Sequence, residues 1–299
     1  MPGRSDGIAL NAAAIGVFDS GVGGLSVLRH IRAALPAEQL CYLADAGFAP
    51  YGERDEAQIV VRSLAAAAFF AGSGAKAMVV ACNTATAAAI DAIRLQHPAM
   101  SVIGVEPGLK PAAELSVSRT VGVLATAATL GSARFAQLQA QVTAATGARF
   151  LLQPCPGLAS QIEKGALRAP ATARLVASLV RPLLAQGADV LVLGCTHYPF
   201  VLPLIEAAVA AHRRPDTSRR VQIVDTGSAV ARQLVAVLRT KAQLATGPAP
   251  AELMAYSTGS RSTLEQAFIR LLGVAVPVGG IVLDRDDSAG MATQPATAL

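Results

Sequence analysis

Tryptophan is absent from this 299-residue sequence, and aromatic residues of any kind make up only 4% of it. The net charge of +5 would permit binding to nucleic acid, but the basic residues are scattered along the chain. The one basic cluster comprises Arg213, Arg214, Arg219 and Arg220 around Pro215, and no aromatic residue is interleaved with it. Because nucleic-acid sites combine basic with aromatic side chains, we interpret this cluster as a solvated loop and expect no nucleic-acid partner.

Long apolar runs are also missing. The longest, such as Leu64–Ala71 and Val190–Cys195, are far shorter than the roughly 20 residues that a membrane-spanning helix needs. The first fourteen residues carry Arg4, Asp6 and Asn11 and lack the continuous apolar core of a signal peptide. We therefore expect a soluble, cytoplasmic protein with no membrane partner.

The four cysteines stand far apart in the sequence, at positions 41, 82, 155 and 195, so the chain has no CxxC pair. That spacing does not favour a structural metal site, and we predict no metal. In a reducing cytosol the thiols should stay free, which leaves buried and catalytic roles. We interpret Cys41, among apolar neighbours, and Cys155, beside two prolines, as small buried hydrophobic residues.

What the sequence does contain is a regular alternation of short β-rich runs with Ala-rich helical stretches, which is typical of parallel α/β proteins. We expect helices at Asp55–Ala71 and Thr172–Ala185, the second ending before Gly187. The predicted strands are Ile15–Asp19, Cys41–Asp45, Met78–Cys82, Val102–Val105, Val121–Thr126, Phe150–Gln153, Val190–Cys195 and Ile223–Thr226. Their continuous apolar character predicts parallel sheets covered by helices on both faces.

Two interruptions divide this pattern. Pro107, Gly108 and Pro111 break it near the middle of the chain, and the polar stretch 213–220 breaks it again. The pattern therefore predicts an α/β fold of two similar doubly wound domains, with mainly parallel sheets and a ligand cleft between the domains.

The domain bounds follow from these crossings. We expect a first domain of residues 14–106 and 225–283, and a second domain of residues 107–224 inserted into it. The terminal stretches 1–13 and 284–299 lack periodicity, so we expect them to be mobile.

The ends of two predicted strands resemble each other. Val79–Thr84 reads Val-Val-Ala-Cys-Asn-Thr and Leu191–Thr196 reads Leu-Val-Leu-Gly-Cys-Thr. Each half thus presents a cysteine at the carboxyl end of a parallel strand, where such folds bind their ligands. The N-terminus of the following helix lowers the pKa of a thiol placed there. Cys82 and Cys195 are therefore the candidate catalytic residues.

Two opposed thiols answer a specific chemical need. Inverting the configuration of an amino acid requires removal of the α-proton from one face and return of a proton to the other, which a thiolate and a thiol on opposite sides can do. Pyridoxal phosphate chemistry needs a Schiff-base lysine, and none of the lysines at positions 76, 110, 164 and 241 has a context that recommends it. We predict a racemase that uses no cofactor and acts on a small amino acid.

The segment Asp19–Gly24 follows the first strand, and its glycines let the backbone approach a ligand closely. It also resembles part of a dinucleotide fingerprint, with Ser26 at the third glycine position and Asp45 near the ribose position. Asp19 would repel a pyrophosphate but suits the ammonium group of an amino acid. His197, two residues after the last cysteine, is placed to relay protons or to stabilise a thiolate.

In combination these motifs resemble the glutamate racemase family, within the aspartate/glutamate racemase superfamily. They occur in the family's order and cover about residues 15–258. The matching segments are Phe18–Leu25, Pro50–Glu53, Ala81–Ala85 and Gly194–Pro199, with weaker matches at Gly104–Pro107, Gly122–Thr126 and Asp225–Gly227.

This resemblance implies cofactor-independent interconversion of the two enantiomers of glutamate, with Cys82 acting on D-glutamate and Cys195 on L-glutamate. It implies that Asp19 and His197 assist their neighbouring thiols, that the D-glutamate supplies peptidoglycan synthesis, and that the chain forms a homodimer. The implied substrate-binding residues are Asp19, Ser20, Tyr51, Gly52, Asn83, Thr84, Thr196 and His197, with Asp45 and Glu163 as acidic residues behind them.

Three other interpretations stay open from the sequence. A related racemase could act on aspartate or on a hydantoin. The Asp19–Gly24 loop could serve a nicotinamide oxidoreductase. A third possibility is a binding protein, because some members of the family are reported to restrain DNA gyrase; the charge of +5 is the only feature in its favour.

Overall fold

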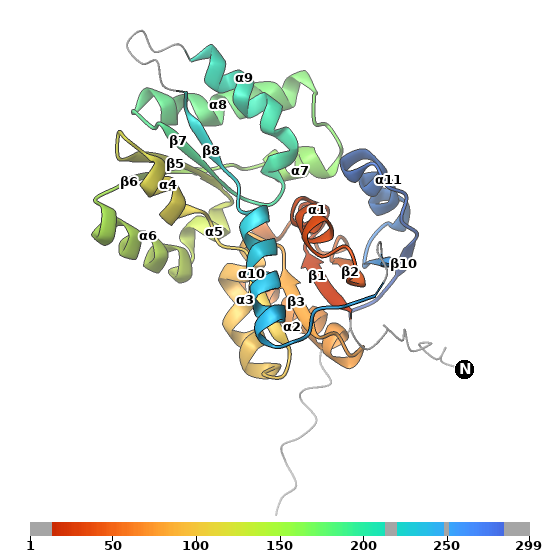
Figure 1. Cartoon of the computed structure of the whole chain (residues 1–299). Helices are drawn as coiled ribbons and strands as arrows, with labels where there is room; N and C mark the ends of the chain where they lie inside the picture. Colours follow the sequence, from red (N-terminus) through yellow and green to blue (C-terminus); the bar gives the residue numbers. More distant parts are fainter. Residues whose placement is uncertain (1–13, 213–219, 248–250, 284–299) are drawn as a thin grey trace, which may run out of the picture.

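Two parallel sheets, each covered by helices, make up the part of the chain that the computed structural model describes, residues 14–212, 220–247 and 251–283 (Figure 1). The tails predicted to be mobile, 1–13 and 284–299, and most of the predicted loop 213–220 lie outside these residues. No helix within the described ranges is long and apolar enough to cross a membrane.

The larger sheet has six strands in the order β10-β9-β2-β1-β3-β4, and all of its pairings are parallel. Its strands are β1 (Ile15–Asp19), β2 (Leu40–Ala44), β3 (Ala77–Val80), β4 (Ser101–Gly104), β9 (Leu253–Ser257) and β10 (Val278–Gly280). The central strands are buried on both faces, which explains their continuous apolar sequences.

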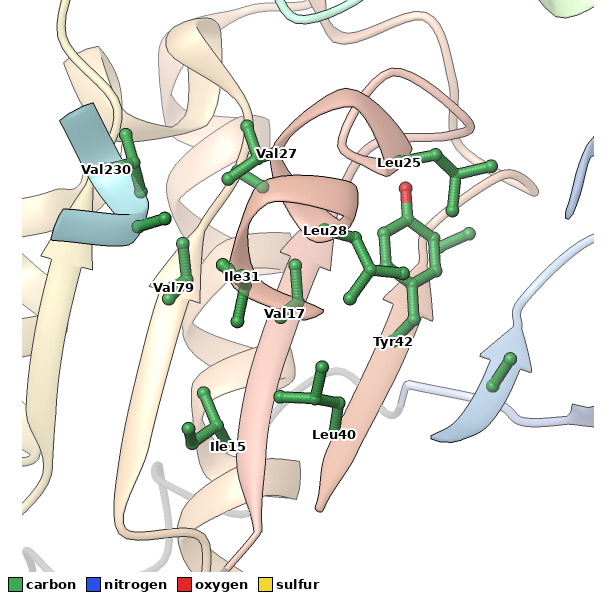
Figure 2. Packing of buried hydrophobic residues seen from close by; sticks show 14 of the residues in the cluster. Ile15, Val17, Leu25, Val27, Leu28, Ile31, Leu40, Tyr42, Val79 and Val230 are labelled. Atoms are coloured by element: carbon green, nitrogen blue, oxygen red, sulfur yellow. The ribbon is translucent and has the colours of Figure 1, made fainter. Parts of the chain in front are cut away.

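Helices cover both faces of this sheet because successive strand side chains point to opposite sides. Ile15 and Val17 pack against α1 (Leu25–Ala34), α10 (Gly227–Thr240) and α11 (Arg261–Leu272). Figure 2 shows this packing, with Leu28 and Ile31 of α1 over the strands. Phe18 points to the other face, which α2 (Glu56–Gly72) and α3 (Asn83–Gln96) cover.

The smaller sheet has four parallel strands in the order β6-β5-β7-β8. They are β5 (Thr120–Ala125), β6 (Arg149–Pro154), β7 (Val190–Gly194) and β8 (Gln222–Val224). One face packs against α4 (Leu109–Leu115) and α6 (Ala133–Thr146), and the other against α7 (Leu158–Glu163), α8 (Pro170–Ala185) and α9 (Leu202–Ala211). The short helix α5 (Ala127–Gly131) and the 3₁₀ helices η1 (Tyr51–Glu53) and η2 (Tyr198–Val201) lie at strand ends.

The strand order of the smaller sheet repeats within the larger one. The series β2-β1-β3-β4 corresponds, strand for strand along the chain, to β6-β5-β7-β8. We call each sheet with its covering helices one half of the protein. Cys82 follows β3 and Cys195 follows β7, so the two cysteines occupy equivalent places in the two halves. The resemblance between the two cysteine segments therefore has a counterpart in the topology.

The predicted fold class is confirmed, and the eight predicted strands and two helices lie within two residues of their observed bounds. The strands β9 and β10 are absent from the prediction. β10 is three residues long with two glycines, so no side-chain pattern marks it. β9 is as long as β1, but most of its residues are only half-buried, so it lacks the continuously apolar sequence of the central strands. The assignment of residues 14–106 and 225–283 to one domain and 107–224 to another stays a prediction.

An almost completely buried ion pair lies under the amino-terminal edge of the larger sheet. Lys76 Nζ is 2.5 Å from Glu38 Oε2, and their side chains are 10% and 2% exposed. Lys76 also donates to the carbonyl of Gln243 at 2.7 Å, and Glu38 accepts from the N–H of Ala245 at 2.8 Å. The pair thus joins the segment after α10 to the strand that leads to Cys82.

Replacing Lys76 by Met should lower the free energy of unfolding by about 3 kcal/mol, because it leaves the Glu38 carboxylate buried without its counter-ion. Urea denaturation followed by circular dichroism measures this change. Lys110→Met is the matched control, since Lys110 is exposed. Equal midpoints for the two variants would contradict the prediction.

Candidate active site

The loop between β1 and α1 brings the backbone of one half against side chains of the other. A Cβ atom at Gly21 would collide with the carboxylate of Glu163, and one at Gly23 would collide with the imidazole of His197. Val22 donates its N–H to Glu163 Oε1 at 2.9 Å. The glycines therefore serve close approach between the two halves of the protein.

Two further hydrogen bonds cross between the carboxyl edges of the sheets. Ser26 Oγ donates to the carbonyl of Thr196 at 2.7 Å. Thr196 Oγ1 donates to Asp19 Oδ2 at 3.3 Å, and the other oxygen of Asp19 accepts from the N–H of Gly21 at 2.7 Å. The strand ends of the two sheets thus form one continuous site.

Cys82 lies at the N-cap of α3 and is 6% exposed. Its Sγ accepts from the N–H of Ala85 at 3.4 Å, and its thiol donates to Ser20 Oγ at 3.7 Å. Burial raises the pKa of this thiol to about 12; the negative charges of Asp19 and Cys195 also raise it, against the Ala85 N–H. The helix N-terminus is expected to lower this pKa, but burial outweighs it, so Cys82 without a ligand is a protonated thiol.

Cys195 follows β7, is 7% exposed, and heads a chain of polar groups. Its Sγ is 3.5 Å from Nδ1 of His197, whose Nε2 is 2.6 Å from Oε1 of Glu163. Burial lowers the pKa of His197, but Cys195 and Glu163 outweigh burial and raise this pKa well above its ordinary value. Burial raises the pKa of Glu163, but the hydrogen bond and charge of His197 outweigh it and lower this pKa. The imidazole is therefore an imidazolium paired with a carboxylate beside the sulfur.

Asp19 is fully buried at the end of β1. Burial raises its pKa, and the negative charge of Glu163 raises it further. The charge of His197 and the N–H groups of Gly21 and Gly24 oppose this rise. A positive group that entered the site would stabilise the charged form of this carboxylate.

Asp45 is buried at the end of β2, and hydrogen bonds from its neighbours saturate it. It accepts from Tyr51 Oη at 2.7 Å, from Arg62 at 2.6 and 2.9 Å, and from Thr258 Oγ1 at 2.7 Å. Its carboxylate therefore fixes the position of Tyr51. It does not lie among the groups around the two sulfurs described above.

Asn83 and Thr84, the two residues after Cys82, place further hydrogen-bonding groups near the sulfurs. Asn83 Nδ2 is buried and has no hydrogen-bond partner within the described part of the chain. Thr84 Oγ1 lies 3.0 Å from Thr126 Oγ1 and 3.3 Å from Thr129 Oγ1. A Cβ at Gly52 would touch the side chain of Thr126, which places this segment against the same hydroxyls.

Thr126 and Thr129 lie beside the candidate site residue Thr84 and are not among the residues expected from the sequence. Thr126 could be found from the repeated strand order. Because β5 corresponds to β1, Thr126 at the end of β5 lies close to the position equivalent to Asp19 at the end of β1. The spacing from Thr126 to Thr129 is the N-cap geometry of α5, in which Thr126 Oγ1 accepts from the N–H of Thr129.

The structure brings together the predicted catalytic residues Asp19, Cys82, Cys195 and His197, and the predicted binding residues Ser20, Thr196, Asn83 and Thr84 lie among or next to them. Glu163 belongs to this group through His197, whereas Asp45 lies behind Tyr51. In the described ranges, no group of three His, Cys, Asp or Glu side chains could hold a metal ion. The arrangement can transfer protons from two sides to a small charged molecule held between the sulfurs.

The chain is similar in sequence and in fold to known amino-acid racemases. The Asp/Glu/Hydantoin racemase family matches residues 15–234. A protein of Ectopseudomonas mendocina named glutamate racemase is 49% identical over 261 residues, which cover 87% of this chain and 95% of that protein. The crystal structure of glutamate racemase from Francisella tularensis in complex with D-glutamate has a TM-score of 0.78 and 27% identity, covering 92% of this chain and 99% of that one. The Escherichia coli glutamate racemase in complex with L-glutamate and the activator UDP-MurNAc-ala has a TM-score of 0.75 and 29% identity, covering 89% and 97%.

Replacing Glu163 by Gln should lower the pKa of His197, because a neutral amide cannot stabilise the imidazolium as a carboxylate does. Nuclear magnetic resonance titration of the histidine ring signals measures this pKa. Glu206→Gln is the control, since Glu206 is exposed on α9. An unchanged His197 titration in the Glu163 variant would contradict the assigned pair.

The same variant tests the pH dependence of stability. The folded-state pKa of His197 is raised, so its contribution to stability is fully present below the unfolded-state pKa and is lost as pH rises through the folded-state pKa. The folded-state pKa of Glu163 is lowered, so the pair is lost again when strong acid protonates this carboxylate. Glu163→Gln should therefore be destabilised most between the pKa of Glu163 and the unfolded-state pKa of His197, and should approach the parent chain in strong acid and at alkaline pH.

Proposed function

Because the chain belongs to the Asp/Glu/Hydantoin racemase family, we propose that it is a glutamate racemase that interconverts L- and D-glutamate by a two-base mechanism. The observation that carries the proposal is the pair of buried thiols at equivalent strand ends of the two sheets, Cys82 and Cys195. They are free cysteines that approach one site from different halves of the protein.

In the direction from L- to D-glutamate, the thiolate of Cys195 removes the α-proton. The Cα–H bond breaks, an S–H bond forms on Cys195, and the electron pair stays on the substrate as a carbanion. The thiol of Cys82 then protonates the opposite face, so that its S–H bond breaks and a new Cα–H bond forms. The enzyme is left with Cys82 as the thiolate and Cys195 as the thiol, which is the state that accepts D-glutamate.

The surroundings of the two sulfurs suit these opposite starting states. The raised pKa of Cys82 keeps it a proton donor, while the imidazolium of His197 provides an N–H that stabilises a thiolate at Cys195. Glu163 holds that imidazolium in place. In the reverse direction Cys82 is the base, and the family resemblance assigns Asp19 to assist it. The negative charge of Asp19 raises the pKa of Cys82, which makes the Cys82 thiolate, once formed, a stronger base.

Substrate binding follows from the remaining groups. The ammonium of glutamate is placed near Asp19, where its charge compensates a buried carboxylate. The buried amide of Asn83 and the hydroxyls of Ser20, Thr84 and Thr196 bind the carboxylates, and we add the hydroxyls of Thr126 and Thr129 to this set. Since Asp45 occupies the hydroxyl of Tyr51, Tyr51 and Gly52 act through their backbone N–H groups.

The proposal also covers the domain arrangement, the cellular compartment, the oligomeric state and the use of the product. The two sheets with their helices form two domains, residues 14–106 with 225–283 and residues 107–224, and glutamate binds in the cleft between them. The enzyme acts in the cytoplasm as a homodimer without a cofactor, and its D-glutamate supplies peptidoglycan synthesis. The homodimer and the use of D-glutamate are implied by the resemblance of the sequence motifs to the glutamate racemase family.

The test starts from pure L-glutamate in D₂O. With two bases, the early D-glutamate should carry deuterium while the remaining L-glutamate stays protonated, because the solvent-derived proton comes only from Cys82. Mass spectrometry of the separated enantiomers measures both labels. Equal labelling of both enantiomers would show a single base and overturn the mechanism.

Cys82→Ser and Cys195→Ser should each reduce racemisation by at least about 100-fold, because a serine hydroxyl is a far weaker acid and base at the α-carbon. Cys41→Ser is the matched control, since Cys41 is buried on β2 away from the site. Circular dichroism checks that each variant folds. Near-normal turnover by either site variant would contradict the assigned roles.

The substrate itself is tested by comparing L-glutamate with L-aspartate under identical conditions. Because a relative named glutamate racemase is 49% identical over 261 residues, L-glutamate should turn over faster. Faster turnover of L-aspartate would replace glutamate in this proposal while leaving the two-thiol chemistry in place.

A further inference from the structure

Tyr198 is buried directly beside Cys195 and has no part in the reaction described above. It begins η2, it is fully buried, and its N–H donates to the carbonyl of Cys195 at 3.1 Å. Its ring packs in the apolar cluster that also contains Cys155, Leu158 and Cys195. Packing alone would be served as well by a phenylalanine ring.

The hydroxyl of Tyr198 is therefore the feature that needs an explanation. The oxygen is completely buried and has no partner in hydrogen-bonding geometry among the described residues. Buried phenol hydroxyls normally form a hydrogen bond, because an unpaired polar group loses its hydrogen bonds to water without replacement. In the described part of the chain, the sulfurs of Cys155 and Cys195 belong to the same buried cluster as the ring and interact with this hydroxyl.

The sheet explains why this hydroxyl meets two sulfurs. β6 and β7 pair with opposite sides of β5, and Ala125 faces both Pro154 and Gly194, the residues that precede the two cysteines. Strands two places apart are separated by about 9–10 Å, which exceeds the roughly 7 Å that a disulfide tolerates between Cα atoms. The two thiols therefore cannot be bridged directly and share the tyrosine hydroxyl as a common neighbour.

The two sulfurs differ as hydrogen-bond acceptors. Cys155 donates its own thiol hydrogen to the carbonyl of Gln153 at 3.3 Å, and burial raises its pKa to about 12, so it stays a neutral and weak acceptor. Cys195 has to carry a negative charge in one half of the proposed reaction. A hydrogen bond to a charged sulfur is roughly twice as strong as one to a neutral group.

We propose that Tyr198 is a positioning residue whose hydroxyl donates a hydrogen bond to the Cys195 thiolate, and that the Cys155 sulfur accepts this hydrogen while Cys195 is protonated. This inference rests on the proposed role of Cys195. While Cys195 is protonated, its sulfur has no charge to attract the Tyr198 hydroxyl. In that state the hydrogen bond to Cys155 keeps the hydroxyl between the two sulfurs.

Other charged groups also face Cys195 and define the background for a test. His197 lies beside it and is held by Glu163 from α7, Cys82 approaches from α3, and Asp19 is linked through Thr196. None of these groups is changed by removing the tyrosine hydroxyl. A shift in the titration of Cys195 after that removal therefore reports the hydroxyl itself.

The experiment measures alkylation of Cys195 by iodoacetamide as a function of pH in the full chain without substrate, with mass spectrometry distinguishing the four cysteines. Only the thiolate reacts, so the midpoint follows the titration of this thiol. Tyr198→Phe should raise the midpoint by about one pH unit, equivalent to about a tenfold loss of thiolate at neutral pH. Cys155→Ala should lower the midpoint, because the hydroxyl then has no competing acceptor.

The opposite signs of these two changes separate a hydrogen-bond role from a packing role, which would move both variants the same way. Tyr256→Phe is the matched control, since Tyr256 lies on β9 outside the site, and it should leave the midpoint unchanged. An unchanged midpoint in Tyr198→Phe, or a raised midpoint in Cys155→Ala, would overturn the inference. Because no substrate is present, the result is independent of whether the chain racemises glutamate.

Discussion

One carboxylate oxygen joins the two halves of this protein at the site. Glu163 Oε1 accepts a hydrogen bond from Val22, in the loop after β1, and forms the ion pair with His197, which follows β7. The position of the imidazolium beside Cys195 therefore depends on a backbone N–H that belongs to the sheet of Cys82. This coupling makes the chemistry of one thiol conditional on the contact between the two halves.

The repeated strand order supplies the frame for that contact, and differences between the repeats supply the chemistry. The equivalent strands β3 and β7 both end near a cysteine, but the groups around the two sulfurs differ. Cys82 faces a carboxylate and is kept protonated, whereas Cys195 faces an imidazolium. Opposite electrostatic surroundings at equivalent positions allow one sulfur to begin as an acid and the other as a base.

Much of this arrangement could be predicted from the sequence because parallel strands buried on both faces have continuous apolar sequences and end at a common edge. That rule located Asp19, Cys82 and Cys195, and the motif after the last cysteine located His197. The edge strand β10 could not be predicted in this way, because its pairing depends on the backbone rather than on its side chains.

Other features depend on contacts between distant residues, which spacing does not show. The bonds of Asp45 to Arg62 and Thr258, and the hydroxyl contact between Thr84 and Thr126, join segments that only the folded chain brings together. For the same reason the local sequence of Cys155 indicates only a small buried residue, whereas its interaction with Tyr198 depends on the pairing of β6 and β7 with opposite sides of β5. For these pairs, the position of each residue in the strand order predicts which residues meet better than its local sequence does.

The burial of the two sulfurs also bears on how long the enzyme survives. With exposures of 6% and 7%, neither thiol offers much surface to peroxide, and oxidation of cysteine follows both thiolate character and exposure. The packing that buries both sulfurs therefore also protects them from oxidation.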